Sequence, residues 1–166
     1  MRLVVGLGNP GEEYARTRHN LGWMVLERLH PDGWKAASKF DGESIKDGET
    51  IYIKPTTYMN RSGEAVRAAA DFYKVVPADV LVVSDDLDLP FGEVRFRAEG
   101  GSGGHNGLAD LITHLGTKDF PRLRIGIGRS TMDPTDYVLS RFTPDEEEQL
   151  PEILDQAITE LERHRE

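Results

Sequence analysis

Short apolar runs alternate along the chain with stretches in which apolar residues recur every three or four positions. Leu3–Leu7 and Val80–Val83 are continuous apolar runs of the length typical of buried strands. Val94–Arg97 and Leu123–Ile127 alternate apolar and polar side chains, which indicates strands with one exposed face. The segment "FDGESIKDGETIYIKP" predicts two further strands joined by a turn at Asp47-Gly48, with the second strand ending at Pro55.

Helical spacing follows most of these strands. Leu21–Leu29 is apolar and predicts a helix, and a second helix is expected after Ser62, which is a candidate N-cap. Leu108–Leu115 forms one apolar helix face that ends at a glycine, and Thr143–Glu146 is typical of a capping box at the start of a last helix. Alternating strands and helices predict an α/β fold, and the hairpin favours a mixed sheet. We therefore predict a single domain over residues 1–166, a three-layer α/β/α sandwich around a twisted mixed β-sheet.

Composition narrows the class of protein. The chain has 166 residues, 38% hydrophobic and 30% charged, which suits one globular domain. It has no cysteine, so disulfides, thiolate metal sites and a cysteine nucleophile are excluded. No apolar stretch approaches the roughly 20 residues of a membrane helix, and the N-terminus shows no signal peptide, so we expect a cytoplasmic protein without membrane contact.

The charge is unevenly distributed. The formal net charge of −9 argues against a nucleic-acid partner, but residues 141–166 hold nine acidic and three basic side chains. The rest of the chain is therefore close to neutral. A local basic surface there is compatible with the negative net charge of the whole chain.

Two glycine clusters resemble known motifs. Gly6-x-Gly8-x-x-Gly11 matches the dinucleotide fingerprint, but the following "EEYARTRHN" has almost no apolar face for the helix which that motif requires. Gly100–Gly104 matches the Gly-x-Ser-x-Gly nucleophile elbow, but the preceding "VRFRAE" is charged rather than a buried strand. A tight turn and a flexible loop, respectively, are the favoured interpretations.

Polar residues stand at the ends of several predicted strands, where ligand sites of α/β sheets collect. They are Asn9, His19, Asn60, the three acids Asp85, Asp86 and Asp88, and His105-Asn106. Each of these residues also has an interpretation without a catalytic role. His19 suits an ordinary surface histidine, Asn60 a turn residue and Asn106 a helix N-cap. The acids of "SDDLD" suit a solvated turn, or a cluster that binds a divalent cation. If they converge, a histidine with a carboxylate and amide donors suits water activation against an activated acyl group such as an ester.

The chain resembles the bacterial-type peptidyl-tRNA hydrolase family over nearly its full length. The matching segments are "VGLGNPGEEYARTRHNLG", "KPTTYMNRSG", "VVSDDLDLPFGEVRFR", "GGSGGHNGL" and "FPRLRIGIGR". The resemblance implies an enzyme that hydrolyses the ester between a peptide and the 3′ ribose of tRNA, which recycles tRNA from stalled or abortive translation. It implies no metal and no cofactor, and a monomer whose partner is peptidyl-tRNA, bound through the acceptor stem and 3′ end.

The resemblance also assigns roles by position. His19 is expected to be the general base, Asp85 to support it, and Asn9 to discriminate N-blocked from free aminoacyl-tRNA. Substrate positions are Tyr14, Tyr58, Met59, Asn60, His105 and Asn106, and positions near the acceptor stem are Arg95, Arg97 and Arg124. Apart from the resemblance, the positive charge of Arg129 suits a further phosphate contact. Family members often continue with a more basic segment beyond the last predicted helix here, which can cover the site. A non-catalytic RNA-binding relative and a small-molecule esterase remain the alternatives.

Overall fold

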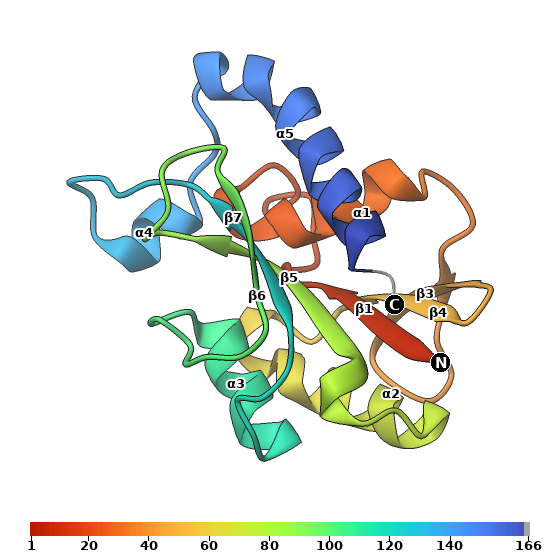
Figure 1. Cartoon of the computed structure of the whole chain (residues 1–166). Helices are drawn as coiled ribbons and strands as arrows, with labels where there is room; N and C mark the ends of the chain where they lie inside the picture. The colour runs from red at the N-terminus through yellow and green to blue at the C-terminus, as the bar shows by residue number, and fades with distance from the viewer. Residues whose placement is uncertain (165–166) are drawn as a thin grey trace.

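A single mixed β-sheet forms the centre of the computed structural model, which describes residues 1–164 (Figure 1). Its strand order is β2-β3-β4-β1-β5-β7-β6. The strands are β1 (Arg2–Gly6), β2 (Lys35–Ala36), β3 (Gly42–Asp47), β4 (Thr50–Pro55), β5 (Val80–Asp86), β6 (Val94–Arg97) and β7 (Arg122–Gly126). The central strands β4, β1, β5 and β7 are parallel, and the outer strands pair antiparallel. The predicted mixed sheet is confirmed.

Helices cover both faces of this sheet. On one face lie α1 (Leu21–Leu29) and α5 (Pro144–Arg163), and on the other lie α2 (Ser62–Tyr73) and α3 (Asn106–Leu115) (Figure 1). The α/β sandwich is therefore confirmed. The short elements were not predicted from sequence: α4 (Pro134–Val138) and the 3₁₀ turns η1 (Arg18–Asn20), η2 (Met59–Arg61) and η3 (Pro77–Asp79). Among the described residues, no helix is long and apolar enough to cross a membrane.

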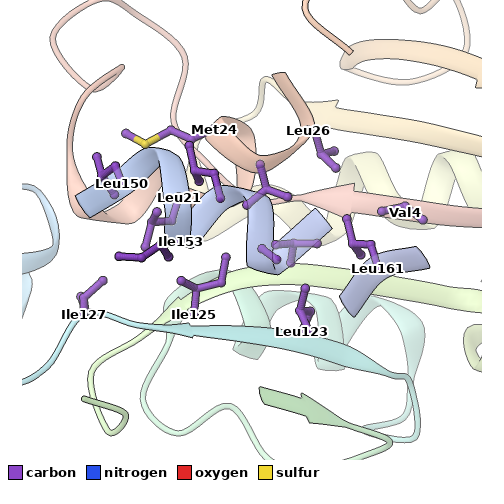
Figure 2. Close-up of a cluster of buried hydrophobic side chains, with 14 of the residues drawn as sticks. Val4, Leu21, Met24, Leu26, Leu123, Ile125, Ile127, Leu150, Ile153 and Leu161 are labelled. Atoms are coloured by element: carbon purple, nitrogen blue, oxygen red, sulfur yellow. The ribbon is translucent and has the colours of Figure 1, made fainter. Parts of the chain in front are cut away.

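Two apolar cores hold the layers together. Figure 2 shows the core under α1 and α5, where Leu21 of α1 and Leu150 and Ile153 of α5 pack near Ile125 of β7. Side chains of a strand alternate between the faces, so Leu3 of β1 belongs to the second core, under α2 and α3. Each large side chain buried in this way contributes about 1.5–3 kcal/mol to the stability of the fold. The packed cores therefore hold in place the sheet edge that carries the polar residues.

Two predicted helix caps are wrong in detail. Helix α2 begins at Ser62, whose hydroxyl donates to the carbonyl of Met59 at 2.8 Å instead of capping the helix. Helix α3 is capped by His105, not by Asn106. The capping box of α5 is confirmed, because the Thr143 hydroxyl accepts from the backbone of Glu146 and the Glu146 carboxylate accepts from the backbone of Thr143.

The glycines after β1 serve close packing. A Cβ at Gly6 would lie 2.4 Å from the carbonyl oxygen of Gly22 at the start of α1, and a Cβ at Gly8 would lie 2.6 Å from the ring of Trp23. Gly11 has a φ of +108° and makes the turn. No helix opens directly after β1, since α1 begins only at Leu21. The dinucleotide interpretation is therefore excluded by the local structure.

Candidate active site

The carboxyl ends of the parallel strands bring five of the candidate residues together. Asn9 follows β1, Met59 follows β4, Asp85 lies near the end of β5, and His105 precedes α3. His19 lies on η1, directly before α1, and reaches Asp85 with its side chain. A cavity of about 120 Å³ lies beside three of them, His19, Asp85 and His105. It is lined by His19, Asp85, Asp86, Leu87, Ser102, Gly103, Gly104, His105, Asn106, Leu108, Pro134, Thr135 and Val138. The cavity has room for a few water molecules and the end of a substrate.

His19 and Asp85 form a buried pair. Nδ1 of His19 lies 3.0 Å from Oδ1 and 2.9 Å from Oδ2 of Asp85, and both residues are more than nine-tenths buried. A carboxylate only accepts hydrogen bonds, so Nδ1 carries the proton and donates it to Asp85. Nε2 of neutral His19 is then the unprotonated nitrogen, and it has no hydrogen-bond partner within residues 1–164. His19 therefore presents a free basic nitrogen at the cavity.

His105 fixes the other side of Asp85. Its Nδ1 accepts from the backbone amides of Gly107 at 3.1 Å and Leu108 at 3.2 Å, which caps α3. Because Nδ1 accepts, the ring proton lies on Nε2, which donates to Oδ1 of Asp85 at 2.9 Å. His105 is thus held as one neutral tautomer by the helix that it caps. It orients Asp85 instead of offering a second base.

Asp85 and His19 shift each other's pKa in opposite directions. Burial disfavours the carboxylate, but the electrostatic attraction and hydrogen bonds from the Nδ1–H of His19 and the Nε2–H of His105 outweigh this effect and hold the pKa of Asp85 well below its usual range. Burial likewise disfavours protonated His19, yet the Asp85 carboxylate outweighs it and raises the pKa of His19 above 6.5. Asp85 is therefore ionised at neutral pH and stabilises the imidazolium that forms when His19 takes a proton.

The acids of "SDDLD" do not act as one cation cluster. Asp85 is a buried strand residue paired with two histidines, so the solvated-turn interpretation is wrong for it. Asp86 accepts from Arg124 at 3.4 Å, and Asp88 pairs with Arg129. Within residues 1–164, only His19, Asp85 and His105 are close enough to share an ion. A metal on Nε2 of His105 would force a proton onto Nδ1, against the two amides of α3 that it caps, so this set fits a metal poorly.

Asn9 is fixed by two neighbours. The Asn20 side chain accepts from the Asn9 backbone N–H at 2.9 Å and donates to the Asn9 carbonyl at 3.0 Å. The Asn9 side-chain oxygen accepts from the backbone N–H of Met59 at 2.7 Å. This bond leaves the Asn9 amide NH₂ as a donor without an acceptor among the described residues. Asn20 was not predicted as a site residue, and the signal for it was its place beside His19.

Tyr14 and Tyr58 lie beside this network. Their rings meet edge to face, with centroids 6.4 Å apart, and the side chain of Tyr58 is half exposed. Tyr58 has φ +71° and ψ 153°, a backbone conformation that is nearly restricted to glycine. The next residue, Met59, donates its backbone N–H to the Asn9 side chain, and this bond helps to keep Tyr58 in the strained conformation. A strained, exposed aromatic residue beside a buried polar network is typical of a ligand contact.

Four arginines share one face of the β6–β7 ladder. The register pairs Arg95 with Arg124 and Arg97 with Arg122, and cross-strand partners point to the same side. This face is opposite to the one on which α5 packs, since Phe96 belongs to the core under α5. Burial, and to a smaller extent the charges of Arg97 and Arg124, lower the pKa of Arg122 to about 10. Arg122 was missed from sequence.

The remaining predicted site residues are more exposed and make fewer contacts. Asn60 is exposed and makes no hydrogen bond with the described residues, and Asn106 is exposed at the rim of the cavity. The Ser102 hydroxyl bonds to the backbone N–H of Gly104, at 3.4 Å, and not to a histidine, which excludes the nucleophile elbow. Helix α4, which was not predicted, lines the cavity with Pro134, Thr135 and Val138.

Fold and site together define an α/β protein with a histidine–carboxylate pair at the carboxyl edge of its sheet, a class that includes hydrolases. The sequence model of the family described as "Peptidyl-tRNA hydrolase" matches residues 3–166. This chain therefore belongs to the peptidyl-tRNA hydrolase family, whose function is the hydrolysis of peptidyl-tRNA.

Relatives and solved structures agree with this assignment. The chain is 48% identical to the peptidyl-tRNA hydrolase of Gloeobacter violaceus, with 98% of this chain and 86% of that protein covered. It is 51% identical to that of Chloroflexus aggregans, with 93% and 87% covered. The crystal structure of the peptidyl-tRNA hydrolase from Acinetobacter baumannii superimposes with a TM-score of 0.90 at 37% identity, over 98% of this chain and 87% of that one.

Proposed function

We propose that this chain hydrolyses the ester bond between the peptide and the 3′ ribose of tRNA, with His19 as the general base that activates water. The observation that carries the proposal is the pair of hydrogen bonds from His19 to Asp85, which leave Nε2 free at the cavity. The protein acts in the cytoplasm as a monomeric single domain over residues 1–166, without a metal or cofactor.

The reaction proceeds through water. Nε2 of His19 takes a proton from a water molecule in the cavity, and the oxygen attacks the ester carbonyl. Asp85 stabilises the imidazolium without taking its proton. When the tetrahedral intermediate collapses, the carbon–oxygen bond to ribose breaks and His19 returns the proton to the 3′ oxygen. The products are a peptide with a free carboxyl group and a tRNA with a free 3′ hydroxyl.

Asn9 supplies the hydrogen-bond donor of the site. Its NH₂ group is the free end of an amide whose oxygen is held by Met59. A donor fixed in this way stabilises a developing oxyanion or binds a carbonyl of the substrate without reorganising. The acylated α-nitrogen of a blocked aminoacyl group brings such a carbonyl, and a free amine lacks it. This chemistry supports the role of Asn9 in discriminating blocked from free substrates.

The surroundings of the cavity suit the RNA part of the substrate. The exposed ring of Tyr58 and the partly exposed ring of Tyr14 provide stacking surfaces for the terminal ribose or a splayed base. Asn60, Asn106, Met59 and His105 complete this end of the site. Arg95, Arg97 and Arg124 bind phosphates of the acceptor stem, which is recognition of backbone and shape that suits many tRNAs.

The choice among three classes of protein rests on one assay. The purified chain is incubated with N-acetyl-aminoacyl-tRNA, with free aminoacyl-tRNA and with the ethyl ester of the same N-acetylated amino acid. We expect rapid hydrolysis of the first substrate only. Binding of the tRNA without hydrolysis would indicate a non-catalytic RNA-binding relative, and equal hydrolysis of the ethyl ester would indicate a small-molecule esterase.

A further inference from the structure

Three consecutive residues of η1 reach three different parts of the chain. Arg18, His19 and Asn20 are all more than nine-tenths buried. His19 bonds to Asp85 on β5, and Asn20 bonds to Asn9 after β1. Arg18 reaches in a third direction, to the segment that leads into α5. The orientation of this single turn is therefore set from three sides.

The Arg18 guanidinium is tightly held. It donates to the Ser140 hydroxyl, the Arg141 carbonyl and Oε1 of Glu146, each at 2.6 Å, and it lies over the ring of Tyr137 at 4.3 Å. The backbone N–H of Arg18 also donates to the carbonyl of Ser140 at 3.1 Å. A planar guanidinium with three acceptors and a ring beneath it has one permitted orientation, which a lysine does not reproduce.

The acceptor on α5 is itself fixed. Oε1 of Glu146 also accepts from the backbone N–H of Thr143 at 2.8 Å, so the carboxylate that closes the first turn of α5 is the one that holds Arg18. Helix α5 buries an apolar face against the sheet through Leu150 and Ile153. Arg18 thus connects the turn of His19 to an element anchored in the core.

We propose that Arg18 is a positioning residue, which holds His19 against Asp85 by fastening η1 to the N-terminus of α5. This inference rests on the proposed function only for its effect on the rate. Arg18 is not among the residues that line the cavity, so it acts through its neighbour and not on the substrate. The charged or titratable groups that face His19 are Asp85 from β5 and His105 from the start of α3, and neither contacts Arg18.

The chain offers a matched control. Arg16 joins the same two segments through an ion pair with Glu147, two residues earlier and on the exposed side. A substitution at Arg16 therefore removes an equal charge and a similar cross-link, but not one that orients the catalytic turn. For the acceptor side, Glu146→Ala removes the partner of Arg18, whereas Thr143→Ala removes the other half of the capping box and leaves Arg18 bound.

The test compares Arg18→Met, Arg18→Lys and Arg16→Met by steady-state kinetics on N-acetyl-aminoacyl-tRNA and by NMR titration of the His19 imidazole, assigned with His19→Gln. We expect Arg18→Met to lower kcat about ten- to hundredfold with little change in KM. We also expect it to move the His19 titration midpoint, Arg18→Lys to restore part of both effects, and Arg16→Met to change neither.

A folded Arg18→Met variant with the wild-type His19 titration would overturn the inference. If Arg18→Met does not fold, Glu146→Ala against Thr143→Ala gives the same comparison, and equal His19 titrations in these two would overturn it. If the wild-type protein does not hydrolyse the substrate, the proposed function fails, but the titration still decides whether Arg18 positions His19.

Discussion

The side chain of Asn20 forms two hydrogen bonds with the backbone of Asn9, one to its N–H at 2.9 Å and one to its carbonyl at 3.0 Å. These bonds hold the loop after β1 in place against η1. As a result the oxygen of the Asn9 side chain faces the N–H of Met59, and its NH₂ group remains free for the substrate. The loop after β1, η1 and the chain at Met59 together fix the orientation of the Asn9 NH₂ donor.

Asn9→Asp tests this donor with little change in shape. The aspartate keeps an oxygen for the N–H of Met59, so we expect a folded protein, but it replaces the free NH₂ donor with an acceptor. The ratio of kcat/KM for N-acetyl-aminoacyl-tRNA over free aminoacyl-tRNA is expected to fall about tenfold or more, the effect of removing one hydrogen bond to substrate. An unchanged ratio in the folded variant would remove this role from Asn9.

The pH dependence follows from the charge of His19. Only neutral His19 can accept a proton, and Asp85 raises the pKa of His19 above 6.5. We therefore expect kcat/KM, corrected for hydrolysis without enzyme, to rise with pH through a midpoint above 6.5 and then to level off. In Asp85→Asn the raising charge is gone while burial remains, so the midpoint is expected to move down and kcat to fall about 10²–10⁴-fold. A midpoint that does not move would contradict the pairing.

His105 has two roles that one substitution can separate. Asparagine is a preferred N-cap, so His105→Asn keeps the cap of α3 but is too short to reach Asp85. We expect it to keep most of the stability and to lower kcat about ten- to hundredfold, whereas His105→Ala also loses about 1 kcal/mol of unfolding free energy. His114→Asn, on the same helix, is the control and is expected to keep the wild-type kcat. Wild-type kcat in His105→Asn would show that Asp85 needs no second partner.

The arginine face is tested by charge reversal. Arg95→Glu with Arg97→Glu removes two cations that are expected to bind phosphates, so KM for the tRNA substrate is expected to rise. The slope of log KM against log salt is expected to become shallower by about one for each phosphate that is no longer bound. Arg28→Glu is the control, because Arg28 lies on α1, on the opposite face of the sheet. Arg28→Glu changes the net charge by half as much as the double variant, so an effect on log KM of half the size would indicate net charge and not a defined surface.

Much of the fold follows from periodicity. Strands such as Val80–Asp86 and helices such as Pro144–Arg163 bury enough apolar side chains to be visible in sequence. Short elements are different: η1 and α4 are too brief to show a period, although η1 carries His19 and α4 lines the cavity. Their conformations are set by contacts with distant segments, such as Arg18 with Glu146.

The site was predictable in part. Residues at strand ends, such as Asn9 and Asp85, follow from topology once the order of strands is known. Asn20 and Arg18 were missed because their roles depend on partners 11 and 128 residues away along the chain. His105 was expected to contact the substrate. In the structure its side chain instead caps α3 and donates a hydrogen bond to the Asp85 carboxylate. No local pattern in the sequence shows which nitrogen of a histidine caps a helix.

The most direct test of the account is the hydrolysis of N-acetyl-aminoacyl-tRNA by His19→Gln, measured as kcat beside its thermal unfolding midpoint. Glutamine fills much of the space of His19 and can donate to Asp85, but it offers no basic nitrogen to water. We predict that the variant folds and that kcat falls about 10²–10⁴-fold. A folded His19→Gln protein with the wild-type kcat would contradict the claim that His19 activates the water.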